Sequence, residues 1–261
     1  MTDETILLTR DGHVATVTLN RPDKLNAMTK PMWQRLGAVM EELSADDSLR
    51  CVVLRGAGGK AFSPGNDISE FETDRSNSAQ AKAYGAILHR TLTAIKSCRH
   101  PTVALIEGIC VGGGLEIAAL CDMRICGESS RFGVPIKRLG LVMAYPEIDA
   151  LQQLVGRSTA LEILLEGRLL GAAEALGKGL VTRVVADAEL MNEAMATARR
   201  IAAGAPLVAR AHKQLVRRLM AAAGVLDAEQ AHASFDYLES ADYAEGMAAF
   251  LGKRPPLFRG E

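Results

Sequence analysis

The sequence predicts an α/β fold, in which a core of alternating strands and helices is followed by a helical C-terminal region. Three features predict this class: a hairpin pattern near the N-terminus, an alternation of buried strands with amphipathic helices over the first two thirds, and helical spacing of apolar residues beyond Pro146. The chain contains no low-complexity linker and no internal repeat. We therefore expect an α/β core at residues 1–200 and a helical region at residues 201–261 that is packed on it, not independent.

The first predicted elements are a hairpin, a helix and a buried strand. Residues 6–9 and 14–19 flank Asp11-Gly12, a dipeptide that suits a tight turn between antiparallel strands. Thr29 is a plausible N-cap, and apolar residues recur after it at helical spacing. The apolar run at residues 51–54 then predicts a buried strand.

The alternation continues and then becomes mainly helical. Apolar residues spaced over 84–95 predict a second amphipathic helix, and residues 103–106 predict a further buried strand. Beyond Pro146, helices are expected near residues 187–203, 206–222 and 240–251, interrupted by a strand only at 180–185.

Composition excludes several functional classes. Thirty basic and 31 acidic residues leave a formal net charge of −1, which gives no overall attraction to nucleic acid or membranes. The N-terminus lacks the pattern of a secretion signal and no apolar run has the length of a membrane span, so we expect a cytoplasmic protein. The five cysteines form no C-x-x-C pair and read as reduced, mostly buried residues, and the five histidines lack metal-ligand spacing. We expect no metal and no separate cofactor.

One glycine-rich segment resembles a dinucleotide-binding loop but lacks its context. Residues 56–61 (GAGGKA) follow a strand and match the G-x-G-x-x-A pattern. That pattern requires a helix to begin at the glycines, whereas FSPG at 62–65 predicts a turn. We interpret residues 56–61 as a loop. Phosphate loops, H-E-x-x-H and G-x-S-x-G are absent from the sequence.

The segment with the clearest chemical meaning is 106–118, a strand that leads through Gly112, Gly113 and Gly114 into an apolar helix. First-turn amides of a helix have no acceptor within it, and glycines let a ligand approach them, so an oxyanion is the natural guest. Glu116 lies one turn further on among apolar residues, which should raise the pKa of its carboxyl toward the range useful for proton transfer. A glycine packing site with Glu116 paired to Arg124 or Arg131 explains the segment equally well.

Four motifs in order give the chain a resemblance to the crotonase superfamily, which includes the enoyl-CoA hydratases and isomerases. They are RPDKLNAM at 21–28, GKAFSPGNDI at 59–68, GGGLE at 112–116 and EGMAAFLGKRP at 245–255. The resemblance implies a spiral of ββα units with a C-terminal helical trimerisation region, assembled as a homotrimer or a dimer of trimers. It also implies an enzyme that acts on an acyl-CoA thioester, with coenzyme A as part of the substrate.

The same resemblance assigns candidate site residues. It implies that the backbone amides of Asn66 and Gly113 polarise the thioester carbonyl, and that Glu116 acts as an acid and base on the resulting enolate. The implied substrate-binding residues are Ala27, Ser63, Pro64, Gly65, Asp67, Ile68, Gly112, Ile136 and Tyr145. The residues implied to contact coenzyme A are Lys24, Leu25, Lys60 and, from this or an adjacent subunit, Phe250 and Lys253.

The sequence departs from the hydratase pattern at the second carboxylate. Hydratases of the family place a glutamate directly after an F-G-x-P step, but here FGVP at 132–135 is followed by Ile136, which cannot ionise. Tyr145, Glu147 and Asp149 lie downstream and could replace it, although charge at a helix N-terminus is the favoured interpretation of the two acids.

This departure leaves alternatives open. One helix glutamate combined with a polar residue at Asn66 and an aliphatic residue at the second position is similar to acyl-CoA decarboxylases of the superfamily. A protein that binds acyl-CoA without catalysis is a further alternative, as is a trimer with a purely structural role.

Overall fold

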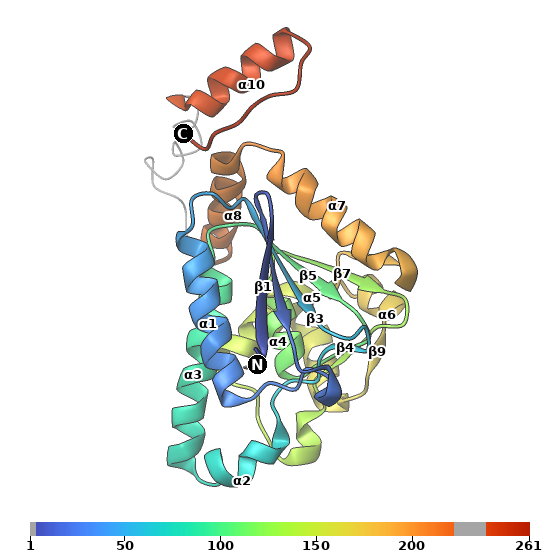
Figure 1. The fold of residues 1–261 in the computed structure, drawn as a ribbon. Coiled ribbons are helices and arrows are strands. Elements are labelled where there is room, and N and C mark those ends of the chain that lie inside the picture. The colour runs from blue at the N-terminus through green and yellow to red at the C-terminus, as the bar shows by residue number, and fades with distance from the viewer. Residues whose placement is uncertain (1–3, 222–238) are drawn as a thin grey trace.

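In the computed structural model of this protein, residues 4–221 and 239–261 are described. The N-terminal strands β1 (Ile6–Asp11) and β2 (Val14–Leu19) form the expected antiparallel hairpin. They begin a six-stranded sheet of order β1-β2-β3-β5-β7-β10 whose other neighbours are parallel (Figure 1). The remaining strands are β3 (Cys51–Gly56), β5 (Thr102–Ile106), β7 (Met123–Gly127) and β10 (Arg183–Val185).

A second, four-stranded sheet has the order β4-β6-β8-β9. Its strands are β4 (Ala61–Ser63), β6 (Ile109–Val111), β8 (Arg131–Gly133) and β9 (Leu170–Gly171). The chain alternates between the sheets, because β3, β5 and β7 of the large sheet are followed directly by β4, β6 and β8 of the small one, and each pair by a helix. This alternation is the spiral of ββα units that the sequence analysis expected.

The helices of the core follow sequence signals closely. Helix α1 (Lys30–Ala45) begins at Thr29, whose side-chain oxygen accepts a hydrogen bond from Met32 N at 3.4 Å, as expected of an N-cap. Helix α3 (Ser78–Ser97) packs against α1. The shorter core helices are α2 (Phe71–Asp74) and α4 (Gly113–Ala119), with 3₁₀ turns at Pro22–Lys24, Ile68–Glu70, Pro135–Leu139 and Asp187–Glu189. Fully buried large side chains such as Trp33, Phe62 and Phe132 fill the space between these layers.

The last third is mainly helical, as predicted. Its helices are α5 (Tyr145–Glu166), α6 (Ala172–Gly177), α7 (Leu190–Ala202), α8 (Pro206–Ala221) and α10 (Ala241–Leu251). Residue 222, where the helix from 206 was expected to end, lies outside the described residues. Figure 1 shows α10 at the opposite end of the molecule from α2.

Two predictions about strands were wrong. The strand expected at 180–185 is limited to Arg183–Val185, because Leu180 N and Val181 N both donate to the carbonyl of Ala175 and close the turn after α6. The small strand β9 (Leu170–Gly171) is also present, so 180–185 does not alone interrupt the helical region. Two residues carry too little periodicity to mark a strand in a sequence.

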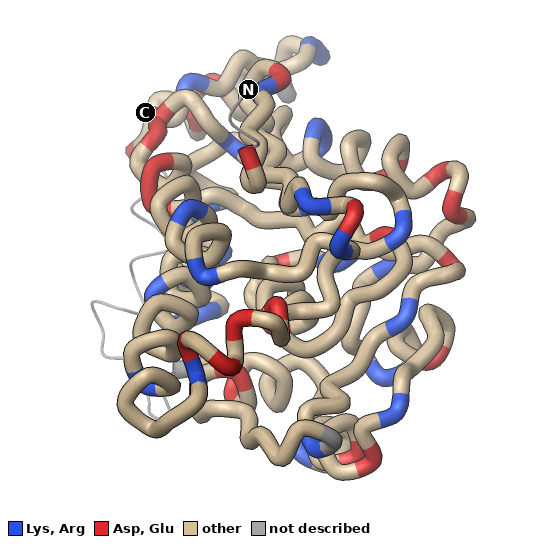
Figure 2. Tube along the Cα trace, turned by 60° about the horizontal axis from the view of Figure 1, so that its bottom comes forward, with Lys and Arg blue, Asp and Glu red and all other residues tan. Residues whose placement is uncertain are grey.

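The surface and the cysteines agree with the composition. Figure 2 shows Lys and Arg interspersed with Asp and Glu along the described chain. All five cysteines are buried free thiols, which confirms the prediction of small buried residues. Among the helices described, none has both the length and the apolar character needed to cross a membrane.

Candidate active site

Three loops converge because the strands before them are parallel. Strand β6 pairs with β4 on one side and β8 on the other, both in parallel, so the carboxyl ends of all three lie at one edge of the small sheet. The chain leaves β4 toward Asn66, β6 toward Gly113 and β8 toward Ile136. Ligands of α/β proteins characteristically bind at such an edge. The topology therefore gathers residues that are 70 positions apart in the sequence, as the difference between 66 and 136 shows.

The loop after β4 is held by hydrogen bonds that leave one amide free. Gly65 N donates to Ser63 Oγ at 3.0 Å, and Met28 N donates to Gly65 O at 2.8 Å. Asp67 N donates to Met28 O at 2.9 Å. The intervening amide of Asn66 has no acceptor within the described part of the chain. It is therefore available to a ligand.

The second amide belongs to the start of α4, in direct contact with that loop. A Cβ on Gly114 would lie only 2.1 Å from Ser63 O, so only glycine permits this approach. Gly65 has a φ of +94°, and a Cβ there would lie 2.6 Å from Gly113 N. Gly113 N, the first amide of α4, also lacks an acceptor among the described residues. Two unused amides thus lie on backbone segments that touch.

A cavity of about 200 Å³ opens beside these segments. The predicted site residues that line it are Pro64, Asn66, Ile68, Gly112, Gly113, Glu116 and Ile136. Most of the other lining is apolar, including Leu88, Val111 and Met143. Small-molecule sites are concave and largely apolar with few polar groups, and this cavity has that character.

Other predicted substrate-binding residues lie around the cavity without lining it. Ser63 is buried and donates to Asn26 O at 2.9 Å, so it shapes the loop. Asp67 pairs with Arg21 at 2.5 Å. Arg21 also donates to the carbonyl of Ala27 at 3.2 Å, and Gly65 provides the tight approach described above. Tyr145 is 90% exposed and is not among the residues that line the cavity.

The residues expected to contact coenzyme A are mostly exposed. Lys24, Leu25 and Lys60 lie at the surface of loops that follow the N-terminal hairpin and β3. Lys253 is exposed on the tail after α10, far from α2, whose Phe71 lines the cavity (Figure 1). The side chain of Phe250 lies outside the described residues. Contact of this tail with the cavity of the same chain therefore has no support in the fold.

Burial raises the pKa of Glu116 to about 8, with a further contribution from the nearby charge of Glu147, while Arg75 acts in the opposite direction. This confirms the expected direction. The alternative in which Glu116 pairs with Arg124 or Arg131 is wrong, because both guanidinium groups donate to backbone carbonyls. A carboxyl with a pKa of about 8 is protonated at neutral pH and can act as an acid.

The raised pKa predicts a specific dependence of stability on pH. Between pH 4.5 and about 8 the folded protein keeps a proton on Glu116 that the unfolded chain releases, so the free energy of unfolding falls as pH rises through this window. Glu116→Gln removes the effect. Relative to the parent, we expect the variant to gain stability on the order of 4 kcal/mol between pH 5 and pH 8.5 in urea unfolding. A difference that does not change with pH, as expected for the exposed control Glu72→Gln, would contradict this.

The structure adds aromatic residues that sequence reasoning missed. Trp33 Nε1 donates to Asn66 Oδ1 at 2.7 Å, and Tyr84 OH lies 3.4 Å from the same oxygen and 3.2 Å from Glu70 Oε2. Arg75 stacks over the rings of Phe71 and Tyr84, at 4.6 and 5.2 Å from their centroids. These contacts orient the Asn66 side chain and place a cation at the cavity wall. Trp33 and Tyr84 lie at ordinary apolar positions of their helices, so only the fold reveals their contacts with Asn66.

Sequence reasoning also missed the contact between the side chains of Glu147 and His89. Glu147 lies in the first turn of α5 and is only 4% exposed. Its Oε1 lies 3.0 Å from Nε2 of His89, which is in the middle of α3. Both side chains line the cavity with Glu116. The acidic residue was visible in the sequence, but its histidine partner from another helix was not.

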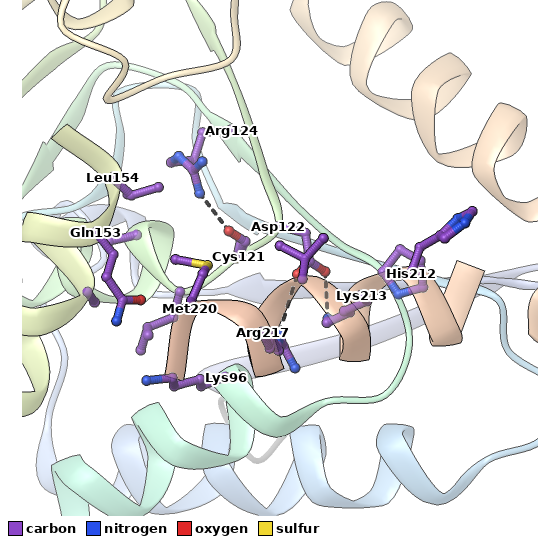
Figure 3. Close-up of a pocket in the computed structure, with 15 residues that line it drawn as sticks. Lys96, Cys121, Asp122, Arg124, Gln153, Leu154, His212, Lys213, Arg217 and Met220 are labelled. Carbon is purple, nitrogen blue, oxygen red and sulfur yellow. Dashed lines mark hydrogen bonds and ion pairs between the residues drawn. The ribbon is translucent and has the colours of Figure 1, made fainter. Parts of the chain in front are cut away.

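A second cavity, of about 380 Å³, lies against α8 (Figure 3). Its charged residues Asp122, Lys213, Arg217 and Arg124 are all engaged in ion pairs or in hydrogen bonds to the backbone. Asp122 accepts from Lys213 Nζ at 2.5 Å and from Arg217 at 3.3 Å, and Arg124 donates to Cys121 O at 2.6 Å. These contacts fasten α8 to the core, so we assign them a structural role.

Comparison with known proteins decides the family. The model of the family described as enoyl-CoA hydratase/isomerase matches residues 9–261. The chain belongs to this family.

Relatives of the family match the enoyl-CoA hydratase/isomerase chain over nearly its whole length. It is 36% identical to a "Probable enoyl-CoA hydratase" of Mycobacterium bovis, covering 99% of both chains. It is 33% identical to the short-chain-enoyl-CoA hydratase of Clostridium acetobutylicum, covering 95% of both. A crystal structure described as an enoyl-CoA hydratase/carnithine racemase from Magnetospirillum magneticum superposes with a TM-score of 0.97 at 49% identity, covering 99% of this chain and 96% of that one. These matches confirm the crotonase fold of the chain.

Proposed function

We propose that this protein is an acyl-CoA enzyme of the hydratase type, which stabilises a thioester enolate with the amides of Asn66 and Gly113. Glu116 serves as the acid and base at the carbon next to the carbonyl. The observation that carries the proposal is the meeting of two unused amides and a carboxyl with a pKa of about 8 in one apolar cavity. The similarity to proteins named as enoyl-CoA hydratases supports the same substrate class.

The chemistry of the cavity explains the proposed roles. When an enoyl thioester reacts at its β-carbon, negative charge develops on the carbonyl oxygen, and each amide aimed at that oxygen contributes about 3–4 kcal/mol to the transition state. The protonated Glu116 is then the acid that transfers its proton to the α-carbon of the enolate. A binding protein without catalysis has no use for a destabilised carboxyl in its cavity, so we rank that alternative lower.

Decarboxylation is the second candidate. It is favoured by Ile136, which lines the cavity with an apolar side chain, and by Arg75, a cation that a substrate carboxylate could approach. It is disfavoured by the negative charge of Glu147, which acts on Glu116 in the same cavity and would repel a substrate carboxylate. We further propose a cytoplasmic enzyme that assembles as a trimer or dimer of trimers, with Phe250 and Lys253 completing the coenzyme A site from an adjacent subunit.

A panel of thioesters tests this proposal. Purified protein is incubated with trans-2-enoyl-CoA esters of increasing chain length and with malonyl-type CoA esters, and products are followed by mass spectrometry. We expect addition of water to at least one enoyl ester. Loss of carbon dioxide from a malonyl-type ester would support the second candidate. Binding of every ester without turnover would contradict both.

A further inference from the structure

We propose that Glu147 is a second catalytic carboxylate of this site, that it works opposite Glu116, and that His89 positions it. The inference rests on the proposed function, since it assigns the missing partner for hydration. It also moves that partner from the end of β8, where Ile136 stands, to the first turn of α5.

Geometry carries the assignment. The Glu147 side chain is 4% exposed, lines the same cavity as Glu116, and uses only one of its oxygens within the described chain. Oε1 contacts His89 Nε2 at 3.0 Å, whereas the buried Oε2 has no hydrogen-bond partner among the described residues. An unpartnered carboxylate oxygen is costly unless something else satisfies it. A water molecule or substrate group in the cavity would do so.

A purely structural role explains Asp149 but not Glu147. Both acids lie near the N-terminus of α5, where negative charge is favourable. Asp149 shows what that role looks like, since its side chain is 47% exposed and contacts Lys96 at 3.6 Å and Gln153 of its own helix at 2.9 Å. Helix capping does not require Glu147 to be buried against His89 in a cavity.

The two carboxyl groups are suited to opposite roles in one turnover. Glu116 holds a proton at neutral pH, and the charge of Glu147 helps to keep it there. Glu147 takes a proton from a water molecule as the water oxygen bonds to the β-carbon. The π electrons move to the thioester oxygen, which the two amides stabilise. The enolate then collapses and the α-carbon takes the proton of Glu116. Water has been added, Glu147 is protonated and Glu116 ionised, and proton exchange with solvent restores the starting state.

His89 acts through Glu147 and is a positioning residue. It projects from α3 across to α5 and is 40% exposed, so it connects the cavity with solvent. Because it contacts Oε1, Oε2 is left as the carboxylate oxygen without a hydrogen-bond partner among the described residues. His89 of α3 contacts this carboxylate, the charge of Glu147 acts on Glu116 of α4, and Arg75 after α2 acts on Glu116 from the wall of the same cavity. Loss of the imidazole should therefore alter the pH profile more than the affinity for substrate.

Two assays on the full chain separate this inference from the proposed function. The first measures hydration of an enoyl-CoA ester. The second measures exchange of the α-protons of a saturated acyl-CoA with deuterium oxide, which needs only the amides and Glu116. We expect Glu147→Gln to lower kcat for hydration by about 100-fold or more with a KM close to that of the parent, and to leave exchange within about threefold. Asp149→Asn is the matched control and should leave both activities unchanged.

Each remaining outcome has one meaning. His89→Gln should lower hydration by about tenfold and shift its pH profile, without a matching change in exchange. If Glu147→Gln hydrates at the parent rate, or loses hydration and exchange in equal proportion, Glu147 is not a second catalytic carboxylate and the inference is overturned. If the parent performs neither reaction, the proposed function itself fails, which is a different result.

Discussion

Replacing Glu116 with glutamine should lower the hydration rate of an enoyl-CoA ester by about 10³-fold while leaving the fold and the binding of the thioester intact. Glutamine has nearly the same shape but cannot supply the proton that the α-carbon needs. The replaced group carries a pKa of about 8, and the other carboxyl group of the cavity, Glu147, is assigned to the water molecule and not to the α-carbon. Because the acid form is required, the parent should also lose activity as pH rises above about 8.

Steady-state kinetics across pH 6 to 10 measure both effects, with pH values chosen on either side of the expected pKa of about 8. Glu72→Gln provides the control, because Glu72 is exposed on α2 and its side chain makes no hydrogen bond or ion pair with the described residues. The assignment of Glu116 fails if the glutamine variant retains more than about a tenth of the parent rate. It also fails if the parent rate rises through pH 8, since that would require the ionised form.

Removing the amide of Gly113 should cost about 10²- to 10³-fold in kcat, and a pair of variants isolates it. Gly113→Pro removes the N–H, and proline is accepted at the first position of a helix. Gly113→Ala keeps the N–H but introduces the same Cβ, which would lie 3.1 Å from the Trp33 ring in both variants. The ratio of the proline to the alanine variant therefore excludes the contact with Trp33 and reports the replacement of the N–H by the proline Cδ.

The measurement is kcat for hydration, combined with circular dichroism to compare the folds of the two variants. We expect KM to change little, because the amide acts mainly on charge that develops during the reaction. Equal rates for the two variants would show that Gly113 N does not contact the reacting oxygen. The Asn66 amide would then remain as the single assigned donor.

The sequence was sufficient to predict the scaffold and the glycine-rich helix start at the candidate site. Strong local signals, such as the N-cap at Thr29 and the amphipathic spacing of α1 and α3, predicted the long elements. The glycines before Glu116 predicted the close approach that the structure has, because steric limits on Cβ act locally and leave a mark in the residue types.

What the sequence could not provide were relations between distant segments. The contact between Glu147 and His89 joins α5 to α3, and the hydrogen bond from Trp33 to Asn66 joins α1 to the loop after β4. Neither partner has a pattern that points to the other. The favoured interpretation of Glu147 as helix charge used only its own helix, where it is correct as to position. Its burial against α3 could be seen only in the folded chain.

Because the fold is a spiral of ββα units, separate units contribute separate residues to the candidate site. Each successive turn of the spiral contributes to the candidate site. The Asn66 amide follows β4, the Gly113 amide and Glu116 follow β6, and the residue at position 136 follows β8. The segments after β4 and β6 are in close backbone contact at Gly65 and Gly114, so a side chain at either glycine would displace the other segment. The segment after β8 does not take part in this contact between Gly65 and Gly114. In a chain built in this way, the reaction can change through substitutions after β8 and in α5, while the two backbone amides stay in place. Ile136 and Glu147 fit such a change under the proposed function.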